Sequence, residues 1–294
     1  MLVRLVTTRF DDIGDRLKAF RLGSGLGAEE VAARLGISRS ALYRFEKGDL
    51  VKIETLERLS QLLDVSMPTL MGVGVEYIGS AVSFFERLRQ IEEQSEHITV
   101  LAGSVSYLLA SGKFDNILPE VLQESLSEET DSRLSDLLGI LSARKKAYQR
   151  RQPGILNLVS GAEIERFLRN GLVGNISLPA SLQSERRLVA RAEAMHLADL
   201  MESQPIGIQV GIVPGTLPHN SFQIFRQVDR RLLALSPFRL GEQPNISVGI
   251  AMITSAEEAL TLHLKMAEEM WNNAKKGPAG AQYLRSLVEI HGTD

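Results

Sequence analysis

Residues 38–47 carry side chains suited to contacts with DNA. At helical spacing, one face of this stretch gathers Arg39, Ser40, Tyr43, Arg44 and Lys47. Arginine pairs bidentately with guanine, serine can bond to a base or a phosphate, and lysine mainly neutralises phosphate. An ordinary solvated helix carries the same residue types, so charge alone leaves both interpretations open.

Two short predicted helices position these side chains. The first covers 28–35 and ends at Gly36, and the second covers 38–47 with Ser38 as its N-cap. Their proportions are those of a helix-turn-helix motif. The apolar positions predicted to face a core are Val31, Leu35, Ile37, Leu42 and Phe45. Helical patterns before and after this pair complete a predicted bundle of five short helices.

The order and spacing of residues over the whole bundle indicate its function more clearly than its charges do. Over residues 13–71 the chain resembles the XRE-type, phage-repressor-like helix-turn-helix family, through "RLKAFRLGSGLGAEEVAARLGISRSALYRFEKGDLVKIETLERLSQLLDVSMPTLM", without a gap. The resemblance implies a DNA-binding domain. It assigns contacts with base edges to Arg39, Ser40 and Arg44, and flanking contacts with phosphate to Tyr43 and Lys47.

The same resemblance implies an ion pair between Arg21 and Glu46, which would tie the first helix to the recognition helix in a structural role. One departure from the family concerns Gly27 and Ala28, which stand where a polar N-cap and a glutamine usually open the first helix of the motif. The phosphate contact of that glutamine is therefore missing. Backbone amides at the helix N-terminus could still meet a phosphate, but we expect weaker positioning on DNA here.

The predicted DNA-binding domain is close to neutral. Residues 1–71 hold 11 Lys and Arg residues against 10 Asp and Glu residues, and the 294-residue chain has a net charge of −3. A single copy with so little positive charge would bind weakly. We therefore expect a homodimer on double-stranded DNA, with two operator half-sites about one helical turn apart.

Length and patterning predict two domains. An all-α, five-helix domain covers 1–72, a connector helix covers 73–96, and an α/β domain with a mixed sheet covers 97–294. The connector either packs on its own domain or mediates dimerisation. Strands are predicted at 98–102, 155–159, 206–214, 222–227, 231–238 and 245–253, the last four as an antiparallel meander, with helices at 127–150, 161–170, 180–203 and 255–276.

The second domain resembles, in the order of its elements, the α/β effector domains found behind XRE-type motifs. The matching stretches are "ARKKAYQRRQPGILNLVSGAEIERFL", "ERRLVARAEAMHLADLME" and "IGIQVGIVPGTLPHNSFQIF". This implies a sensing or oligomerising domain without catalytic residues. The loop at 214–222 either forms a ligand-binding site with His219, Asn220 and Ser221 or only connects two strands. The basic run 143–151 either binds an anion or forms a solvated helix face.

Motifs of catalysis are missing from the sequence. It contains no cysteine, no G-x-x-x-x-G-K-[ST] loop and no G-x-S-x-G elbow. The five histidines form no H-x-H or H-E-x-x-H pair, and Glu193 with His196 supplies only half a metal motif. We therefore expect no enzyme, no metal and no cofactor. Since no stretch is apolar for long enough to span a membrane, we expect a cytoplasmic protein.

Together these patterns favour a transcriptional regulator. A repressor is favoured over an activator because blocking a site requires no further surface. Operator binding would be modulated by a small-molecule effector or by oligomerisation through the second domain. Two other classes stay open: an antitoxin that neutralises a partner toxin, and an enzyme fused to a DNA-binding domain.

Overall fold

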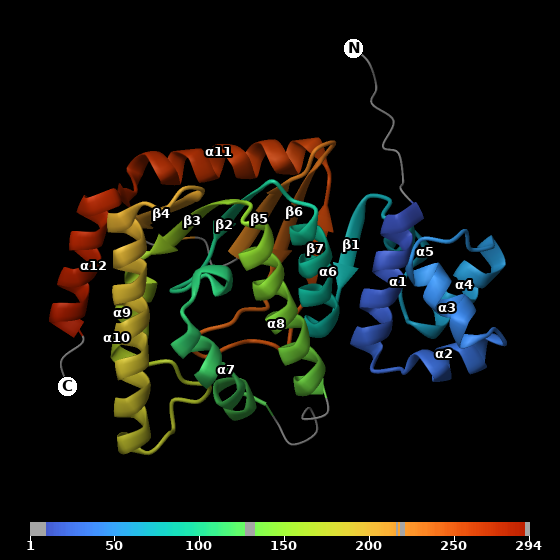
Figure 1. Ribbon diagram of the computed structural model, residues 1–294, viewed down its shortest axis with the longest axis horizontal. Coiled ribbons are helices and arrows are strands. Elements are labelled where there is room, and N and C mark those ends of the chain that lie inside the picture. The colour runs from blue at the N-terminus through green and yellow to red at the C-terminus, as the bar shows by residue number, and fades with distance from the viewer. Residues whose placement is uncertain (1–9, 127–132, 216, 218–220, 292–294) are drawn as a thin grey trace, which may run out of the picture.

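The computed structural model describes residues 10–126, 133–215, 217 and 221–291. Five short helices form an N-terminal bundle, which we call the head: α1 (Phe10–Ser24), α2 (Ala28–Leu35), α3 (Arg39–Glu46), α4 (Ile53–Leu62) and α5 (Met67–Met71) (Figure 1). Every helix contributes at least one almost fully buried apolar side chain to its core, among them Leu17, Val31, Leu42, Leu59 and Leu70. The predicted five-helix bundle is confirmed.

A mixed sheet of eight strands organises the rest of the chain, which we call the sheet domain. In spatial order the strands are β1 (Val75–Ile78), β7 (Ala251–Thr254), β6 (Arg231–Ser236), β5 (Ser221–Arg226), β2 (His97–Leu101), β3 (Gly154–Ser160), β4 (Ile208–Val213) and β8 (Lys275–Lys276). The pairs β2–β3 and β3–β4 are parallel, and the other neighbours are antiparallel. The predicted α/β architecture with a mixed sheet is therefore confirmed.

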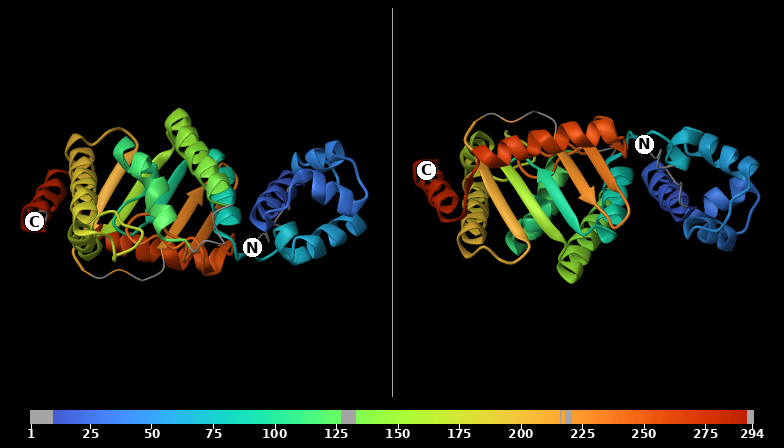
Figure 2. Two further views of the ribbon diagram at one scale, coloured as in Figure 1. Left: turned by 90° about the horizontal axis from the view of Figure 1, so that it is seen from below. Right: turned by 90° about the horizontal axis from the view of Figure 1, so that it is seen from above.

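Helices cover both faces of this sheet, because alternate side chains of its central strands are apolar on each face. On one face, Leu158 and Leu233 pack against Leu260 and Ala267 of α11 (Glu257–Asn273). The other face is covered by α6 (Ala81–Glu93), α7 (Gly112–Glu124), α8 (Leu134–Arg151), α9 (Gly161–Asn170) and α10 (Ala180–Ser203), with α12 (Gly277–His291) packed on α10. Figure 2 shows α11 lying alone across one side of the strands.

The helices α7 and α12 and the short strand β8 were not predicted, and three of the predicted elements differ in the structure. In the segment 73–96, residues 75–78 form the edge strand β1, so that the helix covers only 81–93. The strand β4 is not part of the antiparallel meander, because β2 and β3 lie between it and β5. The last predicted strand is shortened to 251–254, since the residues before it form turns and an isolated bridge between Arg239 and Asn245.

The head lies beside the β1 edge of the sheet domain, and α1 packs along α6 (Figures 1 and 2). A glycine permits this close approach. A Cβ atom added to Gly23 of α1 would come within 1.7 Å of the Ser83 Oγ of α6. A side chain at position 23 would therefore require Ser83 to shift or the two helices to separate.

Candidate nucleic-acid interface

Local signals in the sequence fix the position of α3. The preceding helix α2 ends at Gly36, which adopts the left-handed conformation with φ 67°. The chain then turns through Ile37 to Ser38, whose hydroxyl accepts a hydrogen bond from the backbone N–H of Ala41 at 3.1 Å. This cap starts α3 at Arg39, and Leu42 anchors its inner face in the core of the head.

The outer face of α3 carries the predicted DNA contacts. Arg39, Ser40, Tyr43, Arg44 and Lys47 are all exposed. The Arg39 guanidinium donates to the Tyr43 hydroxyl at 3.1 Å, and its Cζ lies 5.3 Å from the centre of the Tyr43 ring. Arg44 Nε lies 3.8 Å from a carboxylate oxygen of Asp49. The structure thus brings these five side chains onto one accessible surface, where Arg39 and Tyr43 already form a pair.

The inner side of α3 is held by a buried ion pair. Arg21 Nε donates to Glu46 Oε1 at 2.5 Å, and Arg21 Nη2 donates to Glu46 Oε2 at 3.1 Å. Both residues are buried, and this bidentate geometry fixes the rotation of α3 against α1. Glu46 is therefore directed away from the exposed face, where its charge would repel phosphate.

The N-terminus of α2 lacks a side-chain cap. Gly27 is the N-cap residue and makes no side-chain hydrogen bond, while Ala28 is buried. The first turn of α2 also exposes Glu29 and Glu30, and Glu30 pairs with Arg34 at 2.5 Å. These two acidic side chains were not identified from the sequence, although Glu30 lies four residues before Arg34, at the spacing of a helical ion pair. Their charge weakens the attraction of this helix end for phosphate.

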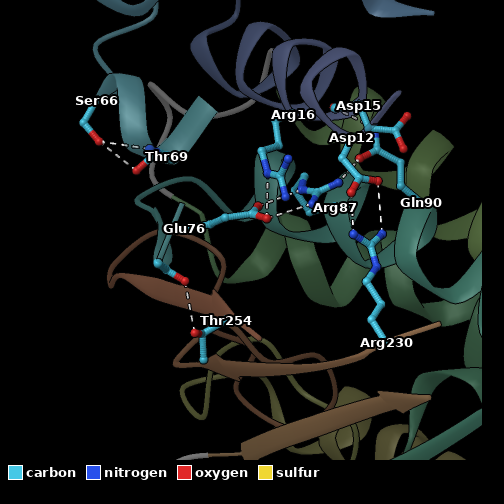
Figure 3. A network of polar contacts seen from close by, with 11 residues as sticks. Asp12, Asp15, Arg16, Ser66, Thr69, Glu76, Arg87, Gln90, Arg230 and Thr254 are labelled. Carbon is cyan, nitrogen blue, oxygen red and sulfur yellow. Dashed lines mark hydrogen bonds and ion pairs between the residues drawn. The ribbon is translucent and has the colours of Figure 1, made fainter. Parts of the chain in front are cut away.

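A buried polar network joins the head to the sheet domain (Figure 3). We call it the docking network; its side chains are Asp12, Asp15 and Arg16 of α1, Glu76 of β1, Arg87 and Gln90 of α6, and Arg230. Glu76 is at its centre, because its carboxylate accepts from Arg16 Nε at 2.7 Å and from Arg87 Nε and Nη2 at 2.9 and 3.0 Å.

Two further contacts of the docking network, Arg230 with Asp12 and Gln90 with Asp15, cross the same boundary. Arg230 donates through both terminal nitrogens to the carboxylate of Asp12, with 3.0 Å between Nη2 and Oδ1. Gln90 accepts from Arg87 at 2.7 Å and donates to the backbone oxygen of Asp15 at 3.0 Å. The head is therefore fixed to the sheet domain by directional contacts between charged groups, in addition to the apolar packing of α1 on α6.

Burial and charge compete in the docking network. Burial alone would raise the pKa of Glu76, but Arg87 and Arg16 together hold that pKa below its ordinary value. In the same way, burial alone would raise the pKa of Asp12, but Arg230 together with Arg16 and Arg87 holds it below its ordinary value. Burial dominates at Asp15 and raises its pKa. The network thus keeps Glu76 and Asp12 charged at neutral pH, which preserves its ion pairs.

The ligand site predicted at 214–222 lies only partly within the described residues. His219 and Asn220 fall outside them. Ser221 begins β5, and its hydroxyl donates to the backbone oxygen of Ser236 at 3.2 Å. The half metal motif serves structure instead: Glu193 accepts from the backbone N–H of Ser111 at 3.0 Å, and His196 Nε2 lies 3.1 Å from the Leu109 carbonyl oxygen.

Across residues 10–126, 133–215, 217 and 221–291, no three His, Asp or Glu side chains gather closely enough to hold a metal ion. Within the same ranges, no helix combines the length and apolar character needed to cross a membrane.

Comparisons with known proteins agree with the geometry of the head. A family model described as "Helix-turn-helix domain" matches residues 12–71. The HTH-type transcriptional regulator SinR of Bacillus subtilis (strain 168) is 35% identical over 80 residues, which are 26% of this chain and 72% of that protein.

Similarity to solved structures extends over more of the chain but is weak. Nuc, a phospholipase D family member from Salmonella typhimurium, gives a TM-score of 0.36 at 14% identity and covers 69% of this chain and 96% of its own. The archaeal chromatin protein TrmBL2 gives 0.34 at 11% identity, with 89% and 92% covered. At these TM-scores neither likeness assigns a fold or a function. By the match of its head to SinR and to the helix-turn-helix model, the chain belongs to the XRE-type helix-turn-helix transcriptional regulators and is a DNA-binding protein.

Proposed function

We propose that this protein is a transcriptional repressor that binds an operator as a homodimer, with one head on each of two half-sites. The observation that carries the proposal is the division of α3: Arg39, Arg44 and their neighbours are exposed on one face, while Glu46 is held inside by Arg21. We propose a binding and switching role for the sheet domain, without catalysis.

Dimerisation would compensate for the weak charge of one head. The first turn of α2 is acidic and lacks a side-chain phosphate contact, so a single head has few groups with which to hold the backbone. Once one head of a dimer is bound, the other head has a high effective concentration at the neighbouring half-site, so the dimer binds more tightly than one head. The spacing of the half-sites would then be set by the docking of each head on its sheet domain.

The helix α6 is the proposed route by which the sheet domain influences DNA binding. It carries Arg87 and Gln90 of the docking network, and it also packs on α8 and on the sheet. A ligand that displaces α6 by a small distance would change the angle of the head. In a dimer, that change alters the distance between two recognition helices and thereby the operator affinity.

Selection of bound sequences from a random DNA pool tests the function directly. We expect two related half-sites with a centre-to-centre spacing of about 10 base pairs. Sedimentation of the protein with the selected DNA should give two chains per operator. Recovery of no preferred sequence would refute the proposed function, and a single half-site bound by one chain would refute the dimer.

Arg39→Ala and Arg44→Ala test the assignment of the recognition face. Each should weaken specific binding about 5- to 150-fold, the range expected for loss of a bidentate base contact. The matched control is Arg151→Ala, which removes an exposed arginine at the end of α8 in the sheet domain. If both head variants keep the affinity and the sequence preference of the unmodified protein, the assignment is wrong.

Ala28→Gln tests the departure at α2. The longer side chain would restore a contact with phosphate, so we expect tighter binding to all sequences with an unchanged preference. Because Ala28 is buried, circular dichroism checks the fold of the variant; weaker binding to every sequence by a folded variant would show that this helix end does not face the DNA backbone.

A further inference from the structure

The sheet domain has a cavity, open to solvent on one side, that the docking network and the recognition face do not use. Its volume is about 140 Å³, and it lies between α6, α8 and the ends of β2 and β6. A cavity of about 150 Å³ is large enough for a benzene ring, and the wall of this one combines polar and apolar groups. Five aromatic side chains contribute to the walls: Phe84, Phe85, Tyr107, Phe222 and Phe238.

Two stretches singled out in the sequence meet at this cavity. The basic run 143–151 contributes Arg144, and the loop at 214–222 contributes Leu217 and Ser221. The expectation that the basic run forms a solvated face is wrong for two of its members. Arg144 and Lys145 are buried and pair with Glu92 and Asp115, whereas later cations of the run are exposed.

Arg144 is the group in the cavity wall that points to a ligand. Its side chain is 3% exposed, and its Nε and Nη2 donate to the two carboxylate oxygens of Glu92 at 3.0 and 2.6 Å. Its Cζ lies 5.3 Å from the ring centre of Phe85 and 5.8 Å from that of Tyr107. Glu92 therefore occupies one edge of the guanidinium, and two aromatic rings flank it.

The second edge of this guanidinium has no acceptor. Nη1 of Arg144 makes no hydrogen bond with any residue that the structure describes, although the residue is almost completely buried and lines the cavity. An arginine in a protein stays protonated, so these N–H groups cannot be removed by titration. Nη1 itself is open to the cavity, so water can reach it there, and a bound carboxylate would replace that water with a charge-assisted hydrogen bond.

Neighbouring polar groups are compatible with an anion at this edge. Burial raises the pKa of Tyr107 to about 12, so its hydroxyl stays protonated at neutral pH and can donate. Of the acidic side chains in the wall, Glu242 accepts from Arg166 at 2.8 Å and from Asn170 at 2.6 Å, and Glu163 lies 3.8 Å from Arg166. A further cation of the wall, Arg239, is exposed and donates to the Gln243 carbonyl oxygen at 3.3 Å.

We infer that this cavity binds a small aromatic carboxylate, with its carboxylate on the free edge of Arg144 and its ring among the aromatic side chains. A carboxylate is planar and presents two oxygens to a guanidinium edge. It carries one charge, so its transfer into an aromatic cavity costs less than that of a phosphate dianion. The geometry therefore favours a carboxylate over a phosphate ester.

The effector role of this ligand rests on the proposed function. Phe84 and Phe85 of α6 line the cavity, and Arg87 and Gln90 of the same helix hold the head. Because a helix moves largely as a rigid unit, occupation of the cavity changes the position of the docking network.

Calorimetric titration of the full chain with benzoate tests the binding site. We expect saturable binding of benzoate, much weaker binding of the neutral analogue benzamide, and no binding of benzylamine. Equal affinity for benzoate and benzamide would overturn the role of Arg144. Tighter binding of phenyl phosphate than of benzoate would overturn the choice of a carboxylate.

Variants locate the site without breaking the fold. Arg144→Lys keeps a cation next to Glu92 but removes the second edge, so benzoate affinity should fall about tenfold or more. Ser104→Phe fills the cavity from its wall and should abolish binding. The matched control is Lys146→Met, which removes an exposed cation from the same run and should leave the affinity unchanged. Circular dichroism checks the fold of each variant, and retention of affinity in both Arg144→Lys and Ser104→Phe would refute the site.

Operator binding is measured separately on the DNA selected above. A change in operator affinity with benzoate that is lost in Arg144→Lys supports the effector role. Benzoate binding without any change in operator affinity refutes that role and leaves the DNA-binding function intact. If the chain selects no DNA, the proposed function fails, while the calorimetric result still decides whether the cavity binds a carboxylate.

Discussion

Replacement of Glu76 by glutamine is the most direct perturbation of the docking network. Glu76 is 4% exposed, and its carboxylate accepts three hydrogen bonds from two guanidinium groups that are themselves buried. Glutamine has nearly the same volume but carries no charge, and its NH₂ group would face the donors of Arg16 or Arg87. The variant therefore leaves two buried cations without their shared anion.

Removal of one member of a buried ion pair typically costs about 3–5 kcal/mol. Since domains are commonly stable by only about 5–15 kcal/mol, Glu76→Gln should remove a large share of the free energy of unfolding. Urea unfolding measures this loss. The single tryptophan, Trp271 of α11, reports on the sheet domain, and far-UV circular dichroism reports on all helices, so the two signals also show whether head and sheet unfold together.

An exposed ion pair provides the control for this measurement. Glu30 pairs with Arg34 on the surface of α2 at 2.5 Å. Glu30→Gln should cost no more than about 0.5 kcal/mol, because water screens the pair. If Glu76→Gln lies within about 1 kcal/mol of the unmodified protein, the docking network does not hold the head as described, since a broken buried pair should cost several times more.

Three further perturbations follow from the described packing and charges. Gly23→Ala places a methyl group against Ser83 Oγ and should lower stability by about 1–3 kcal/mol in thermal unfolding. Addition of Ser83→Gly should restore most of this stability. If Gly23→Ala leaves the stability unchanged, the two helices do not approach as closely as described. The lowered pKa of Asp12 means that its charge stabilises the fold above its ordinary pKa of 3.8 and that this contribution is lost as pH falls through the lower folded value. The raised pKa of Asp15 has the opposite effect on stability. We expect Asp12 and its partner Arg230 to contribute more, so the urea midpoint should decrease when the pH is lowered below about 4, and a constant midpoint would refute this. Asn157 of β3 is fully buried and neither of its amide atoms has a partner among the described residues, so Asn157→Leu should raise stability by about 1–3 kcal/mol in urea unfolding, and a loss of stability would point to an internal water.

The head could be predicted from sequence because its signals are local. Gly36 ends one helix and Ser38 starts the next. The spacing of apolar residues along each helix determines which face is buried. The exposed face of α3 follows from the same period of 3.6 residues. The assignment of Arg21 to Glu46 needed the family resemblance, since nothing local connects residues that lie 25 positions apart.

The sheet edge and the cavity could not be predicted in this way. The strand β1 has only four residues and includes a buried glutamate, whose burial makes sense only with Arg16 and Arg87 around it. Arg144 belongs to a run of cations that looks solvated, and only the position of Glu92 on α6 reveals that it is buried. In both cases the ion-pair partner that permits burial is distant in sequence, so composition and periodicity cannot predict it.

The pairing of β1 with β7 has a consequence for how the chain is made. The hydroxyl of Thr254 in β7 donates to the backbone oxygen of Gly74, and these residues are 180 positions apart. At about 5–20 residues per second, the ribosome needs about 10–35 seconds to cover that distance. For most of this interval the head has left the ribosome, but β1 beside it has no neighbouring strand. We therefore expect a nascent or prematurely terminated chain to present a DNA-binding head with no finished sheet domain to hold it.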